Sequence, residues 1–484
     1  MNIALSRTLL AVAVTLGLAG CMVGPDYQRP QVAVPARYTE LVGWTQAAPA
    51  ASAPKGDWWE GFNDPLLDRL EPLVAVSNQT VREDYANYQA ALAEVKVARA
   101  ALFPTLGIAG TATKQRGGGI AAGNSAVSSA GVTNAGSLEG TASWAPDLWG
   151  KVRRTAEENK ATAQASAATL ANATLSEQTT LATAVIELRI SDADGALLRQ
   201  TVVAYQAYLR VVENQGQAGT APPSDVISAR TQLENVQASL IALGVARAQY
   251  AHAIAVLVGK NPEALDIPPD TTMPTLPDIP VGVPSTLLQR RPDIAVAERQ
   301  MAAANAAIGV AVAAYYPTIS LSASDGFAQS PLAGLLQVAN HVWSLGADLG
   351  ETLFEGGARH GEVAAARANY EAAVANYRGT VLTAFENVED DLAGLRILAR
   401  QADVLDAAVR DATRATQIAL NEYQAGTVDY TTAATAQATQ LSTEQNALSV
   451  EQQRLLAAVS LIGDLGGGWS ASEMDDPPAS IARH

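Results

Sequence analysis

An internal repeat constrains the fold of this chain more than any other feature of its sequence. Three short motifs occur twice and in the same order. Phe103-Pro104-Thr105 is followed later by Tyr316-Pro317-Thr318, Gly219-Thr220 by Gly426-Thr427, and Leu257-Val258-Gly259 by a counterpart near Asp464-Leu465-Gly466. A proline-rich linker over residues 261–284 joins the halves. The sequence therefore predicts two similar repeats, residues 66–260 and 285–466, followed by a tail over 467–484.

Each repeat is predicted to contain a helix, a strand, a loop, a strand, a long helix, a turn and a helix. The first repeat has expected helices over 66–102, 148–215 and 224–258 and strands near 105–114 and 137–145. The second has expected helices over 286–314, 359–424 and 429–462 and strands near 318–327 and 342–351. Residues 117–136 are rich in Gly, Ala and Ser and are predicted to form the first inter-strand loop.

The long helix of each repeat exceeds what a globular core needs. A helix of roughly 65 residues at about 1.5 Å per residue is on the order of 100 Å long. In the second long helix, apolar residues follow coiled-coil spacing, as at Val374, Tyr377, Val381 and Val388. Aromatic residues make up only 5% of the chain, which suits closely packed, alanine-rich helices. Such helices are predicted to span a compartment or to build a tube.

The predicted strands pose a complementary problem. Strands of about ten residues match membrane-spanning strands in length, but four of them cannot close a barrel, and a bilayer tolerates no open edge. Three copies of the chain would supply 12 strands, a plausible even number. The predicted fold is mainly α with a small β part: coiled-coil-like helices form an α-barrel, and four strands per chain enter a trimeric β-barrel. A soluble helical-hairpin protein with small β-caps is the alternative.

The N-terminus has the features of a bacterial lipoprotein signal. Arg7 precedes an almost entirely apolar stretch that is too short to span a bilayer comfortably. The stretch ends at Leu18-Ala19-Gly20-Cys21, a lipobox whose thiol can be acylated. Residues 1–20 are therefore predicted to be removed, and Cys21 to begin a lipidated segment and collar over 21–65. An incidental cysteine after an ordinary signal is the alternative. Met22 replaces the aspartate of inner-membrane retention, which favours the outer membrane.

Composition excludes several classes of function. The formal net charge is −16, which argues against a nucleic-acid partner, since that would require a basic face. One cysteine excludes internal disulfides and zinc clusters, and the four histidines have no metal-ligand spacing. Asp192-Ala193-Asp194-Gly195 lacks the other ligands of a calcium loop. We therefore predict no enzyme activity and no catalytic, cofactor-binding or metal site.

Four segments carry a resemblance to a known family. They are GCMVGPDYQRP at 20–30, WWEGFNDPLLDRL at 58–70, QRRPDIAVAERQMAAANAAIGVAVAAYYPTISL at 289–321 and LIGDLGGGW at 461–469. The chain resembles the lipoprotein branch of the TolC-like outer-membrane efflux factors over essentially its whole mature length. The resemblance implies a homotrimer in the outer membrane with an α-helical barrel in the periplasm. It also implies a periplasmic adaptor and an inner-membrane RND transporter as partners.

The turns that follow the long helices are the candidate gate. They read QGQAGTAPPSDV at 215–226 and EYQAGTVDY at 422–430. In the family these turns form the constricted periplasmic entrance, and the resemblance places Tyr423 and Asp225 at its latch positions. Asp225 is equally interpretable as a first-turn or capping acid after two prolines. Val428 and Thr435 stand where some relatives carry a gate arginine and an inward aspartate, which predicts a weaker latch.

Other motifs have structural interpretations. Pro292 and Asp293 after Arg291 resemble a helix start, with proline at the first position and an acid in the first turn. Trp58 and Trp59 are predicted to pack in the collar, because paired indoles bury much apolar area. Trp144 and Trp149, which flank the passage from the second strand to the long helix, belong either to an interfacial aromatic belt or to the collar core.

The sequence is interpreted as a passive exit duct that conducts drugs or other small toxic compounds from periplasm to exterior. A type I protein secretion channel with the same fold is one alternative. A lipid-anchored structural or adhesive coiled-coil protein is another, which the paired strands disfavour. The substrate and the particular partners are not encoded in any feature of the sequence that we identify.

Overall fold

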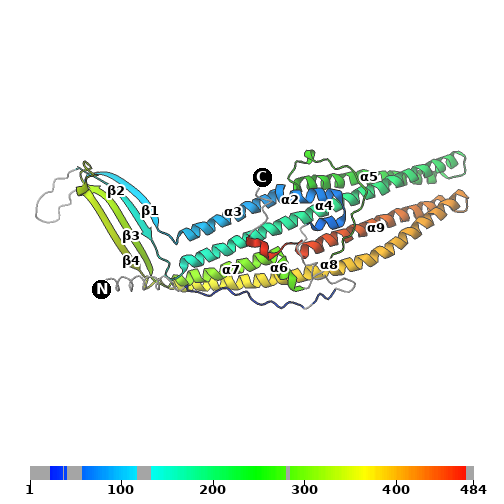
Figure 1. Cartoon of the computed structure of the whole chain (residues 1–484). Helices are drawn as coiled ribbons and strands as arrows, with labels where there is room; N and C mark the ends of the chain where they lie inside the picture. The colour runs from blue at the N-terminus through cyan, green and yellow to red at the C-terminus, as the bar shows by residue number, and fades with distance from the viewer. Residues whose placement is uncertain (1–21, 36, 41–56, 117–131, 280–283, 476–484) are drawn as a thin grey trace. The chain divides into compact units, whose positions relative to one another are not determined.

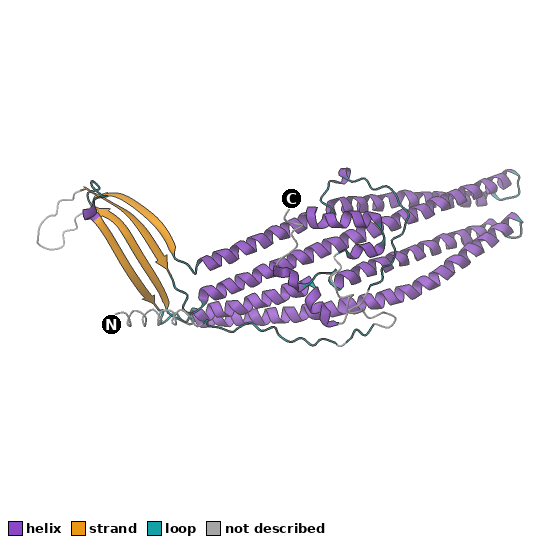
Figure 2. Cartoon of the chain, in the orientation of Figure 1, coloured by secondary structure: helices purple, strands orange, loops and turns teal. Residues whose placement is uncertain are grey.

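A computed structural model describes residues 22–35, 37–40, 57–116, 132–279 and 284–475 of the chain. These residues are mainly helical and contain a four-stranded sheet, which confirms the predicted combination of a large α part and a small β part (Figure 2). The predicted signal, Cys21 and most of the first inter-strand loop lie outside the described residues.

The two halves of the chain contain matching elements in the same order (Figure 1). The first half contains α2 (Pro65–Ser77), α3 (Gln79–Ala100), β1 (Thr105–Arg116), β2 (Val132–Trp144), α4 (Lys151–Gln217) and α5 (Pro223–Leu257). The second contains α6 (Leu287–Arg290), α7 (Pro292–Ala313), β3 (Thr318–Gln329), β4 (His341–Gly350), α8 (Ala358–Gln424) and α9 (Tyr430–Asp464). The long helices α4 and α8 have 67 residues each, and α5 and α9 have 35 each.

Two predicted helices are wrong in one respect, because each is interrupted. The helix expected over 66–102 breaks at Asn78, whose backbone is extended (φ −64°, ψ 134°) and whose side-chain Oδ1 accepts a hydrogen bond from Thr80 N at 2.8 Å. The helix expected over 286–314 breaks at Arg291 (φ −90°, ψ 121°). Arg291 precedes proline, and the proline ring disfavours a helical conformation for the residue before it. The start of α7 at Pro292, with an acid in the first turn, is confirmed.

The sheet is antiparallel throughout, in the order β1-β2-β3-β4. Thr105 is paired with Ser143, and Thr318 with Gly350. The strands lie where the sequence predicted them, except that β2 begins at Val132 rather than near 137. The first residues of β2 have small and polar side chains, which also suit a loop. Composition alone therefore does not distinguish a strand from a loop at these positions.

The chain forms two compact units, each of which takes segments from both halves of the sequence. Unit 1 comprises Met1–Pro30, Gln89–Ala163 and Glu298–Ala375 and contains the sheet. Unit 2 comprises Gln31–Tyr88, Gln164–Ala297 and Asn376–His484 and contains the turns between the long helices and their partners.

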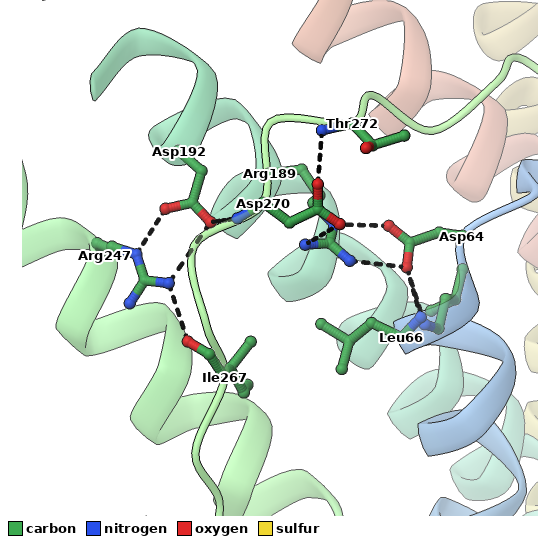
Figure 3. Close-up of polar contacts among 9 residues, drawn as sticks. Asp64, Leu66, Arg189, Asp192, Arg247, Ile267, Asp270 and Thr272 are labelled. Carbon is green, nitrogen blue, oxygen red and sulfur yellow. Dashed lines mark hydrogen bonds and ion pairs between the residues drawn. The ribbon is translucent and has the colours of Figure 1, made fainter. Parts of the chain in front are cut away.

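Ion pairs hold the inter-repeat linker in unit 2 (Figure 3). Arg189 of α4 is paired with Asp64, the N-cap of α2, at 2.7 Å and with Asp270 of the linker at 3.3 Å. Arg247 of α5 is paired with Asp192 at 2.6 Å, and Asp192 also accepts a hydrogen bond from Asp270 N at 3.0 Å. Asp192, which lies in the Asp-Ala-Asp-Gly stretch, thus has a structural role.

Apolar packing in unit 2 confirms that the paired tryptophans are buried. Trp58 and Trp59 are 8% and 5% exposed, and their rings meet edge to face with centroids 5.8 Å apart. Phe62 packs on Trp58 in the same manner at 6.3 Å. Among the described helices, α5 alone is long and apolar enough to cross a membrane by length and composition, although Arg247 in it is ion-paired.

Candidate functional site

The four-stranded sheet has one polar face and one mainly apolar face, which also carries Lys114, Asp325 and His341 toward the inter-strand loops. Successive side chains of a strand point to opposite faces, so the register assigns each residue to one of them. The apolar face carries Leu106, Ile108, Leu138, Trp144, Ile319, Leu321, Phe327, Trp343, Leu345 and Leu349. The other face carries Thr111, Ser137, Thr141, Ser320, Ser322, Ser324 and Ser344. On it, the hydroxyls of Thr111 and Ser137 lie 2.9 Å apart.

The apolar face is open to its surroundings in the single chain. Ile108 is 85% exposed and Leu345 is 76% exposed. Each square ångström of apolar surface left in water costs about 25 cal/mol, and soluble proteins rarely expose such a continuous patch. The edge strands β1 and β4 also leave one side of their backbone without a partner strand among the residues that the structure describes. The sheet therefore suits an apolar environment on one face, and the outer sides of β1 and β4 can accept further strands.

The turns at 215–226 and 422–430, here called the first and second tip turns, share one geometry. Thr220 N donates to Gln215 O at 2.9 Å in the first, and Thr427 N donates to Glu422 O at 3.0 Å in the second. Each turn has glycine in the left-handed region, Gly219 at φ +72° and Gly426 at φ +74°. A glycine in this conformation after the last helical turn is the usual way to satisfy the final carbonyls of a helix.

Tyr423 links the two tip turns within the chain. Its ring is 7% exposed and packs edge to face on Tyr430, with centroids 5.7 Å apart. Its phenol donates a hydrogen bond to Gln215 Oε1 at 2.5 Å. Both rings belong to an apolar cluster that also includes Val212, Ala229, Leu420 and Ala433. Tyr423 thus fastens the end of α8 to the end of α4.

Within the chain, the hydrogen bond of the Tyr423 phenol goes to Gln215, and Asp225 influences that phenol through its charge. Within one chain the phenol donates to Gln215, which lies at the end of the preceding long helix. Burial first, and then the negative charge of Asp225, raise the pKa of Tyr423 above its ordinary value. The phenol therefore remains protonated and able to donate at all physiological pH values.

Asp225 lies in the first turn of α5, behind Pro223 at the first helical position. The N-cap is Pro222, so the interpretation of Asp225 as the capping residue is wrong, and that of a first-turn acid is confirmed. An acid in this position interacts favourably with the positive end of the helix dipole. The carboxylate also accepts a hydrogen bond from Ser224 Oγ at 3.4 Å.

Sequence reasoning missed two residues of the tip turns. Gln215 gave no signal, because it is one of several polar residues at the end of α4. Asp429 was recognisable as an N-cap before Tyr430 and two threonines. Its carboxylate accepts a hydrogen bond from Thr432 N at 3.1 Å, and contacts with Thr431 and Thr432 lower its pKa.

The two residues that depart from the family's pattern have local roles. Val428 is half-buried and packs on the Tyr423 cluster. Thr435 is exposed, and its hydroxyl donates to Thr431 O at 2.8 Å. Neither carries a charge, so any ionic contribution to a latch has to come from elsewhere in the tip turns.

Paired long helices joined to a two-faced four-stranded sheet define a channel-forming class of bacterial outer membrane protein. The sequence model of the outer membrane efflux protein family matches residues 72–260 and 283–467. The chain belongs to this family.

Individual relatives agree with that assignment. The chain is 30% identical over 474 residues to the probable efflux pump outer membrane protein TtgC of Pseudomonas putida, with 96% of each chain covered. It is 31% identical over 474 residues to the outer membrane protein OprJ of Pseudomonas aeruginosa, with 95% of each covered. Among solved structures, the outer-membrane channel OprN superposes with a TM-score of 0.85 at 28% identity, covering 93% of this chain and all of that one.

Proposed function

We propose that the chain is the outer-membrane exit duct of a tripartite efflux pump. The sheet supports this most directly, because its exposed apolar face suits lipid and its polar face suits an aqueous lumen. The strands have 10 to 13 residues, enough to cross a bilayer. Since the sheet has two open edges, three copies would close a barrel of 12 strands.

The proposed pump includes a periplasmic adaptor and an inner-membrane RND transporter. The duct itself is passive, so energy and substrate selection come from these partners. Its conducted solutes are drugs or other small toxic compounds. The relatives named for efflux of toluene or antibiotics support this class of solute.

Lipidation of Cys21 is a separate part of the proposal. The lipobox before it supports acylation after removal of residues 1–20. Mass spectrometry of the purified protein tests this directly. A diacylated or triacylated N-terminal Cys21 is expected, whereas an unmodified Cys21 or a retained Met1 contradicts it.

The tip turns form the proposed periplasmic gate, with Tyr423, Gln215 and Asp225 as its residues. In the proposed gate, opening breaks the Tyr423–Gln215 bond in each of the three copies. A buried neutral hydrogen bond contributes about 1 kcal/mol, so the three bonds favour the closed state by about 3 kcal/mol. That is on the order of a hundredfold in the ratio of closed to open channels. An adaptor that binds the open tips better would shift this equilibrium.

The test is single-channel conductance of purified trimers in a planar bilayer. Tyr423→Phe removes the phenol and Gln215→Leu removes its acceptor, and each is expected to raise the open probability by a similar factor. Asp225→Ala combined with Tyr423→Phe should open the channel at least as far. Tyr208→Phe is the matched control, because Tyr208 packs on the same cluster without a hydrogen bond from its phenol among the described residues.

Two results would contradict these proposals separately. If the open probability is unchanged in assembled Tyr423→Phe and Gln215→Leu trimers, these residues stabilise the helix ends and have no role in gating. If assembled trimers never conduct, either with the unaltered sequence or with the altered tip turns, the duct itself is overturned.

A further inference from the structure

The segment that follows Cys21 is held against the body of unit 1. Val23 N donates to Trp149 O at 3.2 Å. Asn305 of α7 donates through Nδ2 to Pro25 O at 3.0 Å, and the phenol of Tyr27 donates to Glu298 Oε1 at 2.5 Å. Contacts from three successive parts of the segment therefore fix its path over the start of α4 and one face of α7.

The guanidinium of Arg154 is the centre of this arrangement. The side chain is 1% exposed. Its Nε donates to Val23 O at 3.1 Å, and its Nη2 donates to Gly24 O at 3.1 Å and to Asp26 Oδ1 at 2.8 Å. Its Nη1 donates to Glu157 Oε2 at 2.8 Å. A buried guanidinium is costly unless its donors are satisfied, and most of these acceptors belong to the N-terminal segment.

Three glycines create the space in which the segment lies. A Cβ on Gly309 of α7 would lie 2.8 Å from Arg154 Cδ, and a Cβ on Gly150 would lie 2.9 Å from Met22 Cα. Gly24 adopts φ +91°, and a Cβ there would lie 2.5 Å from Gly309 Cα. Real side-chain atoms do not approach so closely, so the backbone of residues 22–24 fits only because these positions lack side chains.

This docking site lies where the sheet of unit 1 passes into its helices. Trp149 stands between the end of β2 and the start of α4, and its ring stacks on Tyr316 with centroids 4.9 Å apart. Its indole Nε1 donates to Pro317 O at 2.7 Å, directly before β3. Met22 therefore lies at the helical end of the strands. Cys21 directly precedes Met22 in the sequence.

We propose that Arg154 and the glycines Gly24, Gly150 and Gly309 form an anchor-positioning site, which docks residues 22–26 and fixes the lipidated N-terminus at the helical end of the sheet. The inference rests on the proposed lipidation of Cys21. The acyl chains then enter the bilayer at the level where the strands leave it. Arg154 acts as a positioning residue, because it contacts the segment and not the lipid.

Electron-electron double resonance measures the docking. A Cys21→Ser chain with an alternative cleavable signal has no other cysteine, so Gln28→Cys and Lys160→Cys carry the only two spin labels. Both positions are exposed and belong to unit 1. Assemblies are diluted with unlabelled chain, so that only distances within one chain contribute. The docked segment is expected to give one narrow distance peak.

Two variants and two controls decide the result. Arg154→Met removes every donor and should abolish the narrow peak, and Glu157→Gln, which leaves the contacts to the segment intact, should preserve it. Gly309→Ala should also abolish it, although alanine in a helix is ordinarily favourable. Gly394→Ala in α8, where a Cβ would meet no atom within 4 Å, should preserve it.

Loss of the peak in both variants, with helix content and assembly unchanged, supports the docking site, because a purely structural role of Arg154 would not free the segment. If Arg154→Met does not fold, Gly309→Ala decides alone. A narrow peak that persists in either assembled variant overturns the docking site. Lipidation is tested independently by the mass of the unaltered N-terminus, since the labelled chain carries no lipid.

Discussion

The junction at Asn78 and the junction at Arg291 occupy matching places in the two halves of the chain, and they combine the same backbone geometry with opposite chemistry. At the first, Asn78 Nδ2 donates to Leu257 O at 3.0 Å, the last carbonyl of α5. At the second, Arg291 Nη1 donates to Asp464 O at 3.1 Å, the last carbonyl of α9. In both cases the residue between two helices donates a hydrogen bond to the last carbonyl of a third helix.

A glycine completes each junction. Gly259 (φ +69°) follows α5, and a Cβ there would lie 2.1 Å from Ser77 O. Gly466 (φ +95°) follows α9, and a Cβ there would lie 2.1 Å from Arg290 O. Each position therefore requires glycine for two reasons: the backbone is in the left-handed region, and a side chain would collide with the neighbouring carbonyl.

The side chains around the junctions differ in charge. Asn78 is neutral, and its second acceptor is Glu177 Oε2 at 2.8 Å. Arg291 is paired with Asp464 at 2.8 Å and Asp293 at 2.7 Å. The two junctions thus share their backbone geometry. The polar group that binds the last carbonyl of the third helix differs, since it is an amide at Asn78 and part of an ion-pair network at Arg291. Only the second junction should therefore respond strongly to loss of charge and to pH.

The largest expected effect is the loss of Arg291. Arg291→Met leaves two partly buried carboxylates without their cation, which should lower the free energy of unfolding by about 3 kcal/mol. Asn78→Ala removes an uncharged donor and should cost about 1–2 kcal/mol. Denaturant unfolding of the detergent-solubilised protein measures both. Equal losses would show that the charge of the second junction contributes nothing beyond its hydrogen bonds.

The glycines should behave alike at the two junctions. Gly259→Ala is expected to lower the free energy of unfolding by about 1–3 kcal/mol more than Gly219→Ala. The two glycines have nearly the same φ, but a Cβ on Gly219 would meet no atom within 4 Å. Gly466→Ala and its control Gly426→Ala should reproduce the difference. A loss at Gly259 no greater than at Gly219 would mean that the backbone contact relaxes freely.

The smallest effect is a pH dependence confined to the second junction. Burial, and then the charge of Asp464, raise the pKa of Asp391 above its ordinary value. Between the lower pKa of the unfolded chain and the raised pKa of the folded chain, the folded chain binds more protons at this site, so the site loses stability as the pH rises through that window.

Asp391→Asn should accordingly flatten the decline in the thermal midpoint from pH 5 to pH 8.5, as followed by circular dichroism. Asp390→Asn is the control, because that neighbour is exposed. An unchanged slope in Asp391→Asn, or the same flattening in Asp390→Asn, would show that protonation of Asp391 does not cause the pH dependence.

Several parts of the fold follow from short-range patterns. The predicted helices ending at 215 and 424 and the structural ends at Gln217 and Gln424 agree closely, because the Gly-Thr turn after each helix is a local signal. The start of α7 was predictable from Pro292 alone. The break at Asn78 was missed, because an asparagine within a helical pattern signals a cap only when its neighbours are known to pack against it.

The candidate site was predictable in part. Tyr423 was identified through the resemblance of its turn to a known family, and it does lie buried between the two tip turns. Its acceptor, Gln215, was not identified. Apolar periodicity and turn composition carry no information about which of several polar residues, some two hundred positions away, a phenol will meet.

The sequence by itself determined the order of the elements, the matching of the two halves and the glycine turns, because periodicity, proline and glycine act on neighbouring residues. Only the tertiary structure decided the partners of the buried polar groups, such as Val23, Gly24 and Asp26 at Arg154. Those contacts join residues that are far apart along the chain. Their choice depends on which donors and acceptors are removed from water together.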